Sequence, residues 1–284
     1  MNTLFESRIH RIQALRKAMV KESLDGLLVS VGENRRYLSG FTAEDHQFDE
    51  SCGMLLITAD KLLLATDSRF ELEARKEASG FEVYIYKKSF SDELPDLLAL
   101  LGIRRMGFES ERISIHQHDR YTESLSKAGY DAVLFPTQNL VENFRIKKDP
   151  DEIAATRAAL HLSETVWEMF VSTVHLGMTE KEASWELEKL LRQGGADALS
   201  FPTIVASGPH AALPHAVPSD RPFAKGEPIL FDWGIKLNGY CSDTSRTVIF
   251  GEPGEKFIRV YETVRNAQSA AIAGIKAGVT GKEV

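Results

Sequence analysis

The sequence has little cysteine, and this scarcity excludes one class of fold. Only Cys52 and Cys241 occur among its 284 residues. Two cysteines are too few for a disulfide framework, and their separation does not match the spacing of a zinc finger. We therefore expect a protein of a reducing compartment, the cytoplasm.

Long apolar runs and an excess of positive charge are also missing. No apolar run reaches the length of a membrane span, and residues 1–12 are charged and amphipathic without the apolar core of a signal peptide. The formal net charge of −7 argues against nucleic acid or an anionic membrane as the main ligand. We expect a soluble, unexported protein with neither of these partners.

Residues 1–140 lack two common catalytic signatures, the glycine-rich phosphate loop and the nucleophile elbow. A helical stripe over residues 9–19 precedes an apolar run at 26–30. Further strands are expected at 53–58, 61–66, 81–86, 105–109 and 131–135, and helices at 71–77, 92–101 and 116–127. We predict an α/β domain in which the polar clusters 34–41 and 66–70 are loop scaffolding.

A strong helix start marks a second domain. Asp149 suits an N-cap, Pro150 suits the first helical position, and Glu152 lies at the capping-box position. We therefore assign residues 141–149 to a linker and residues 150–284 to the second domain.

Two helices open the second domain, and a long irregular segment follows them. The first helix should run to about Thr173, and the second occupies residues 179–193 behind another capping box. A strand is expected at 201–206. Residues 207–225 then carry His210, His215 and several prolines, and irregular segments of this length are usually functional or disordered.

Residues 230–243 predict a β-hairpin that carries two acidic residues. Asn238-Gly239 is a strong signal for a two-residue turn, because both turn positions need positive φ. The register puts Asp232 and Asp243 on one strand face, about 7–8 Å apart at their backbones. Gly234 faces Asp243 and should leave room for an ion between the acids.

Two carboxylates on one buried face repel each other and lose hydration unless a proton or a cation lies between them. Oxygen donors suit hard or borderline divalent metals, and two such ions can share a bridging carboxylate. The alternative is that acids beside a turn are solvated or cap the backbone. Asp243-Thr-Ser also matches an aspartic-protease triplet, but those enzymes pair two triplets in an all-β fold and only one occurs here.

A short internal repeat suggests a duplication. Residues 174–183 and 275–284 share Gly, Thr, Lys and Glu at the same offset, as in Gly177 and Gly278, which lie 101 positions apart. The match is short enough to arise by chance. If it is a duplication, about 67 residues that follow the first copy lack a counterpart after Val284. We then expect a truncated domain whose further His and Glu metal ligands lie beyond this sequence.

Several short segments of the second domain form a recognisable set of motifs: Pro214-His215, Asp232-Trp-Gly, Gly239-Tyr-Cys-Ser-Asp-Thr-Ser-Arg-Thr247, Val260-Tyr261 and Ala277-Gly278. Together they resemble the Xaa-Pro peptidases (aminopeptidase P and prolidase) of the pita-bread metallopeptidases. In the first domain Asn34, Tyr37–Phe41 and Thr66–Arg69 resemble the smaller N-terminal domain that creatinase also has. Thr244-Ser245 departs from the usual hydrophobic residue and Thr, which weakens any assignment to a subfamily.

The resemblance implies a fold, a cofactor and roles for three residues. The expected fold is a creatinase-type α/β domain over residues 1–140, followed by an α+β pita-bread catalytic domain without its second half. Two divalent ions, of manganese, cobalt or zinc, would be bound, with Asp232 on one ion and Asp243 bridging both. His215 would lie beside the metals and donate a hydrogen bond to the substrate carbonyl oxygen. One His and two Glu ligands of the family have no counterpart here.

The implied function is hydrolysis of the peptide bond that precedes proline. The full-length protein would act on peptides with proline in the second position, as a dipeptidase or an aminopeptidase, and would form a homodimer. The present chain would be inactive. Two alternatives stay open: a creatinase-like amidinohydrolase, which the two retained aspartates disfavour, and a peptidase-like scaffold without activity.

Overall fold

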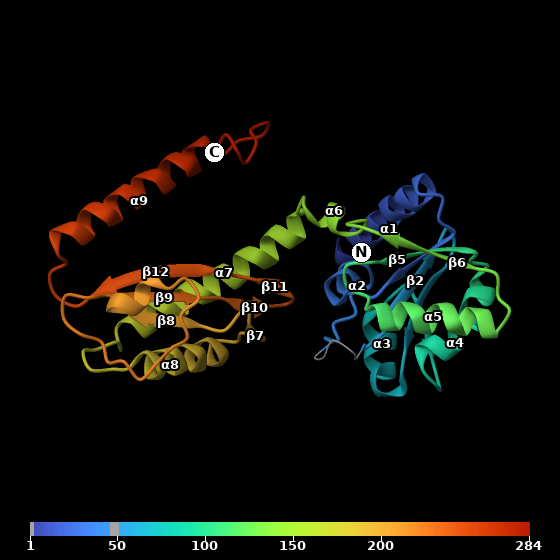
Figure 1. Cartoon of the computed structure of the whole chain (residues 1–284), viewed down its shortest axis with the longest axis horizontal. Helices are drawn as coiled ribbons and strands as arrows, with labels where there is room; N and C mark the ends of the chain where they lie inside the picture. The colour runs from blue at the N-terminus through green and yellow to red at the C-terminus, as the bar shows by residue number, and fades with distance from the viewer. Residues whose placement is uncertain (1–2, 46–50) are drawn as a thin grey trace. The chain divides into compact units, whose positions relative to one another are not determined.

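The chain folds as two compact units, Met1–Asp151 and Glu152–Val284. The computed structural model describes residues 3–45 and 51–284, and Figure 1 draws both units. Among these described residues, the helices all lack the combination of length and apolar character that a membrane crossing requires.

The first unit is built on one mixed sheet of six strands in the order β4-β3-β2-β1-β5-β6. The strands are β1 Gly26–Val29, β2 Met54–Thr58, β3 Leu62–Thr66, β4 Glu82–Ile85, β5 Arg105–Glu109 and β6 Val133–Thr137. β2 runs antiparallel to β1 and β3, whereas β1, β5 and β6 are mutually parallel. All six strands were predicted, and the largest shift is that of β6, by two residues.

Helices cover both faces of this sheet. They are α1 Thr3–Lys21, α2 Gly32–Ser39, α3 Glu71–Glu77, α4 Phe90–Leu101, α5 Ile115–Lys127 and α6 Glu142–Arg145, with a 3-10 turn η1 at Ser68–Phe70. Side chains from α1, α2 and α3 pack on one face, and those from α4 and α5 pack on the other. Because both faces are covered, β2 is buried along its whole length, which explains its unbroken apolar sequence.

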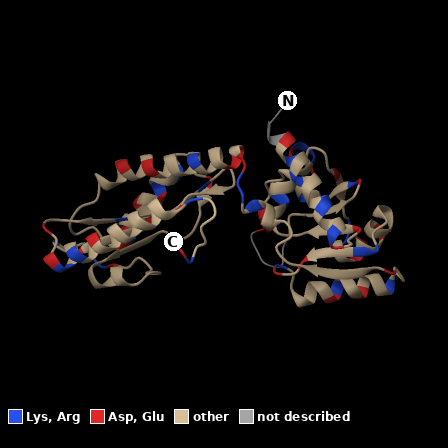
Figure 2. Cartoon of the chain, turned by 90° about the horizontal axis from the view of Figure 1, so that it is seen from above, with Lys and Arg blue, Asp and Glu red and all other residues tan. Residues whose placement is uncertain are grey.

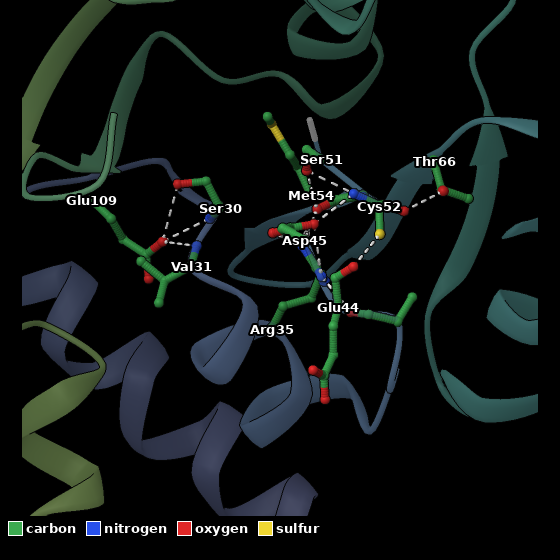
Figure 3. Close-up of polar contacts among 12 residues, drawn as sticks. Ser30, Val31, Arg35, Glu44, Asp45, Ser51, Cys52, Met54, Thr66 and Glu109 are labelled. Carbon is green, nitrogen blue, oxygen red and sulfur yellow. Dashed lines mark hydrogen bonds and ion pairs between the residues drawn. The ribbon is translucent and has the colours of Figure 1, made fainter. Parts of the chain in front are cut away.

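Helix α2 corrects the prediction that residues 34–41 are loop scaffolding. Its buried residues include Arg35, which has no solvent exposure. The guanidinium donates to the carbonyl oxygens of Gly53 at 2.7 Å and Ala43 at 2.6 Å, and it pairs with Asp45 at 3.1 Å (Figure 3). Because this helix buries a hydrogen-bonded cation on its inner face, the apolar periodicity that identifies a helix is missing.

The second unit combines helices with two small sheets, ordered β12-β9-β8 and β11-β10-β7. Its elements are α7 Pro150–Val171, α8 Glu180–Gln193, β7 Ala198–Leu199, β8 Ile204–Ser207, the 3-10 helix η2 Gly208–Ala212, β9 Pro228–Trp233, β10 Ile235–Leu237, β11 Tyr240–Cys241, β12 Thr244–Ile249 and α9 Glu255–Gly274. The predicted capping box of α8 is present: Thr179 Oγ1 accepts from Glu182 N and Glu182 accepts from Thr179 N.

The core of this unit lies on one face of the β12-β9-β8 sheet. Side chains from α7 and α8 pack there against Phe231 and Trp233, both without solvent exposure. The Trp233 ring stacks on Trp167 of α7 with 4.5 Å between centroids. Helix α9 differs from α7 and α8, because none of its described residues is buried.

Charges of both signs alternate along the helices of both units (Figure 2). On α8, for example, Lys189 pairs with Glu186 at 2.9 Å and Arg192 with Glu188 at 3.0 Å. Exposed pairs of this kind contribute little to stability.

Candidate metal centre

The predicted hairpin register is confirmed. Asn238 and Gly239 take positive φ angles of 51° and 80° and form the turn. Leu237 pairs with Tyr240 in β10 and β11, and the same register continues to Trp233 and Thr244 in β9 and β12. Strand alternation in this register places Asp232 and Asp243 on the face opposite to the buried Trp233.

Asp232 is held in place across the strands. It lies directly opposite Ser245, whose hydroxyl donates to Asp232 Oδ1 at 2.8 Å. Asp232 is half-buried, and Asp243, two residues before Ser245, is exposed. The expectation of two carboxylates on a buried face is therefore wrong for this chain: solvent reaches the pair, so in this chain burial does not demand a compensating cation.

Gly234 does not leave the space for an ion that the sequence predicted. A Cβ atom at this position would collide with Ser200 Oγ and with the carbonyl oxygen of Ser242. Ser200 Oγ donates to that same carbonyl at 2.9 Å, and Ser200 N donates to the Gly234 carbonyl at 3.1 Å. Glycine is required here because β7 and the hairpin approach each other closely.

His215 lies in a turn that follows η2 and is exposed to solvent. The better-fixed histidine of this segment is His210, to which the sequence assigned no catalytic role. Its Nδ1 lies 2.8 Å from Glu180 Oε2, and its side chain is 23% exposed. The segment that carries His215 is therefore held by the contact of His210 with Glu180, and not by His215 itself.

Glu180 is a buried carboxylate of this unit, without solvent exposure, at the first position of α8. Burial raises its pKa, but hydrogen bonds from Ser219, Ser207 and His210 outweigh this effect and hold the pKa below its usual value. Glu180 and Ser245 were both missed by sequence reasoning. The hairpin register, which pairs Asp232 with Ser245, was the one available signal for Ser245.

The donor chemistry at Asp232 and Asp243 fits a divalent metal, because both ligands are carboxylate oxygens and a hydroxyl orients one of them. The number of ligands is low. Within residues 3–45 and 51–284, no three His, Cys, Asp or Glu side chains gather in an arrangement that could hold a metal ion. Of the predicted site residues, the structure places Asp232 and Asp243 on one strand face.

The chain matches two families, one for each unit. Residues 11–147 match the creatinase/prolidase N-terminal domain, and residues 154–284 match the metallopeptidase family M24. Similar proteins include the uncharacterized peptidase YqhT of Bacillus subtilis, at 33% identity, and the Xaa-Pro dipeptidase of Pyrococcus horikoshii, at 30%. Both alignments cover 96% of this chain and 74% of the relative.

Solved structures agree with these matches. The Xaa-Pro dipeptidase from Bacillus anthracis superposes with a TM-score of 0.89 at 34% identity, over 97% of this chain and 74% of that chain. The X-Pro aminopeptidase from Thermotoga maritima gives a TM-score of 0.83 at 34% identity, over 94% of this chain and 74% of that chain.

These likenesses confirm the predicted fold class, a creatinase-type N-terminal domain followed by a pita-bread domain with mixed sheets. That half of the second domain is missing stays a prediction. The chain belongs to the metallopeptidase family M24 and carries a creatinase/prolidase N-terminal domain.

Proposed function

We propose that the full-length protein is a metal-dependent peptidase that hydrolyses the bond preceding proline in peptides with proline in the second position. The observation that carries the proposal is the shared face of Asp232 and Asp243 in a chain of family M24. Two relatives named Xaa-Pro dipeptidase support the choice of substrate.

In the proposed site, Asp232 would help to hold one divalent ion and Asp243 would be shared between two. Manganese, cobalt or zinc, when bound, supplies a Lewis acid that activates water and polarises the substrate carbonyl. Ser245 fixes the Asp232 carboxylate through its 2.8 Å hydrogen bond, so that one oxygen keeps its direction. His215 donates a hydrogen bond to the carbonyl oxygen as negative charge develops there.

Further parts of the proposal concern the location of the protein, its oligomeric state and the activity of the 284-residue chain. We place it in the cytoplasm as a homodimer. We also expect the 284-residue chain, assayed alone, to show no peptidase turnover, because two carboxylates are fewer ligands than a firmly held metal pair requires. Measurable proline release by this chain alone would contradict that expectation.

Manganese binding by the full-length protein tests the site. Asp243→Asn should weaken Mn²⁺ binding at least about tenfold in calorimetric titration, the size expected when a metal site is disturbed. It should also remove the release of proline from Xaa-Pro dipeptides. Glu168→Gln, an exposed carboxylate on α7, is the matched control and should change neither quantity.

Three results would contradict the proposal. Activity that survives exhaustive chelation would exclude a metal-dependent peptidase. Turnover of creatine in place of a proline dipeptide would favour the amidinohydrolase. Manganese binding that is absent, or insensitive to Asp243→Asn, would favour a scaffold.

A further inference from the structure

The segment that carries His215 has little regular structure of its own. This histidine segment, defined as residues 207–221, leaves the sheet at the end of β8, forms η2 and turns at His215. It then runs beside the start of α8, where Lys181 N donates to the Ser219 carbonyl and Glu180 N to the Arg221 carbonyl, both at 3.1 Å. Contacts with α8 therefore contribute to its conformation.

One side chain on α8 holds both ends of the segment. Glu180 Oε1 accepts from Ser207 N at 2.7 Å and from Ser207 Oγ at 2.9 Å. Glu180 Oε2 accepts from Ser219 N at 3.0 Å and Ser219 Oγ at 2.6 Å, and it faces His210 Nδ1 at 2.8 Å. A single buried carboxylate thus joins the first residue of the segment to a residue that follows His215.

The contacts also define what Glu180 cannot do. An ionised carboxylate has about four lone-pair positions, and five donor groups from the segment surround this one. It lies at the N-terminus of α8, where the helix dipole favours an anion. With its acceptor positions filled and no exposure, Glu180 is unsuited to exchange protons with a substrate, but it is well placed to fix a loop.

We propose that Glu180 is a positioning residue that holds the histidine segment so that His215 points at the reacting carbonyl. This inference rests on the proposed peptidase function, because the role of His215 does. A misplacement of about 1 Å in a catalytic hydrogen-bond donor can cost about 10²-fold in rate. A purely structural role for Glu180 would change stability without this selective loss of rate.

Backbone mobility tests the first half of the proposal without any metal or substrate. In the 284-residue chain, Glu180→Gln should raise amide hydrogen exchange at Ser207 and Ser219 by at least about tenfold, while β9 and β12 keep their protection. Ser219→Ala removes one of the five donors and should give a smaller increase. The control is Glu182→Gln, an exposed carboxylate on the same helical turn, which should leave the histidine segment unchanged.

Kinetics of the full-length protein test the second half. Glu180→Gln should lower kcat by at least about tenfold with KM and Mn²⁺ affinity within about twofold, the pattern of a group needed only in the transition state. Glu180→Asp, which restores the charge, should recover part of kcat. Unchanged exchange in Glu180→Gln, or faster exchange with unchanged kcat, would overturn the positioning role.

Failure of the proposed function looks different. If the wild-type protein releases no proline, the peptidase proposal fails together with the role of Glu180 in it, whatever the exchange experiment shows. If the wild-type protein is active and the Glu180 variants show the same exchange rates and kcat as the control Glu182→Gln, the peptidase proposal stands and the positioning role is wrong.

Discussion

Each unit contains a buried carboxylate that accepts hydrogen bonds from several donors, and the pKa values of the two carboxylates shift in opposite directions. In the first unit, Glu109 at the end of β5 is 6% exposed and accepts from the backbone N–H groups of Ser30 and Val31, both at 2.7 Å (Figure 3). In the second unit, Glu180 at the start of α8 accepts from the backbone N–H groups of Ser207 and Ser219 in the histidine segment. Both carboxylates connect segments that are distant in the sequence.

The pKa values of these two carboxylates move in opposite directions. Burial raises the pKa of Glu109 above its usual value, and the nearby Glu142 raises it further despite the hydrogen bonds from Val31, Asn34 and Ser30. Hydrogen bonds dominate at Glu180 and lower its pKa. Burial alone therefore does not decide the direction of a carboxylate's pKa shift; the balance among burial, hydrogen-bond donors and neighbouring charges does.

Truncation of the two side chains should give the largest contrast. Glu180→Ala leaves two backbone N–H groups and His210 without their acceptor, and we expect a loss of about 3–5 kcal/mol of stability in the second unit. Glu109→Ala also removes the cost of a buried charge beside Glu142, so we expect only about 1–3 kcal/mol in the first unit. Urea unfolding at pH 7, followed by hydrogen exchange in each unit, measures both losses. Equal losses of unfolding free energy in the two units would show that the two carboxylates do not differ in their contribution to stability.

A change of pH should affect the two carboxylates with opposite sign. The pKa of Glu180 is lowered below that of an unfolded glutamate, about 4.3, so its contribution to stability is complete above that pH and is lost as pH falls through the folded pKa. The pKa of Glu109 is raised, so its cost grows as pH rises from about 4.3 through the folded pKa and is relieved in acid.

The Gln variants make this difference measurable between pH 7 and pH 3. The advantage of the wild-type protein over Glu180→Gln should shrink toward acid pH, and its stability relative to Glu109→Gln should grow. Each comparison uses the unfolding free energy of the unit that carries the substitution. Shifts of the same sign in both pairs would show that one of the two pKa directions is wrong.

Local patterns were enough to predict much of the fold. The turn at Asn238-Gly239 and strand alternation determined the hairpin register, and the capping box at Thr179 located the start of α8. The apolar runs of the first unit predicted its strands, because a sheet covered on both faces buries every residue of a central strand. The predicted register singled out Asp232 and Asp243 on one strand face, and the family resemblance then implied their roles as metal ligands.

What could not be predicted depends on contacts between distant residues. The inner face of α2 is polar, since the buried Arg35 guanidinium reaches Asp45, Ala43 and Gly53. The position beside Gly234 is filled by Ser200, the residue that follows β7. Glutamate is ordinary in the first turn of a helix, so Glu180 is recognisable only when its long-range partners in the histidine segment are known.

The helix caps should show the smallest contrast between the units. Ser114 caps α5 in the first unit and Thr179 caps α8 in the second, each through a capping box with the residue three positions later. Because the local geometry is the same, Ser114→Ala and Thr179→Ala should each cost about 1 kcal/mol in unfolding free energy. Thr179 also precedes Glu180. A loss at Thr179 well above that at Ser114, together with faster exchange at Ser219, would mean that the cap helps to orient the buried carboxylate; equal losses would mean that Glu180 is held by the histidine segment itself.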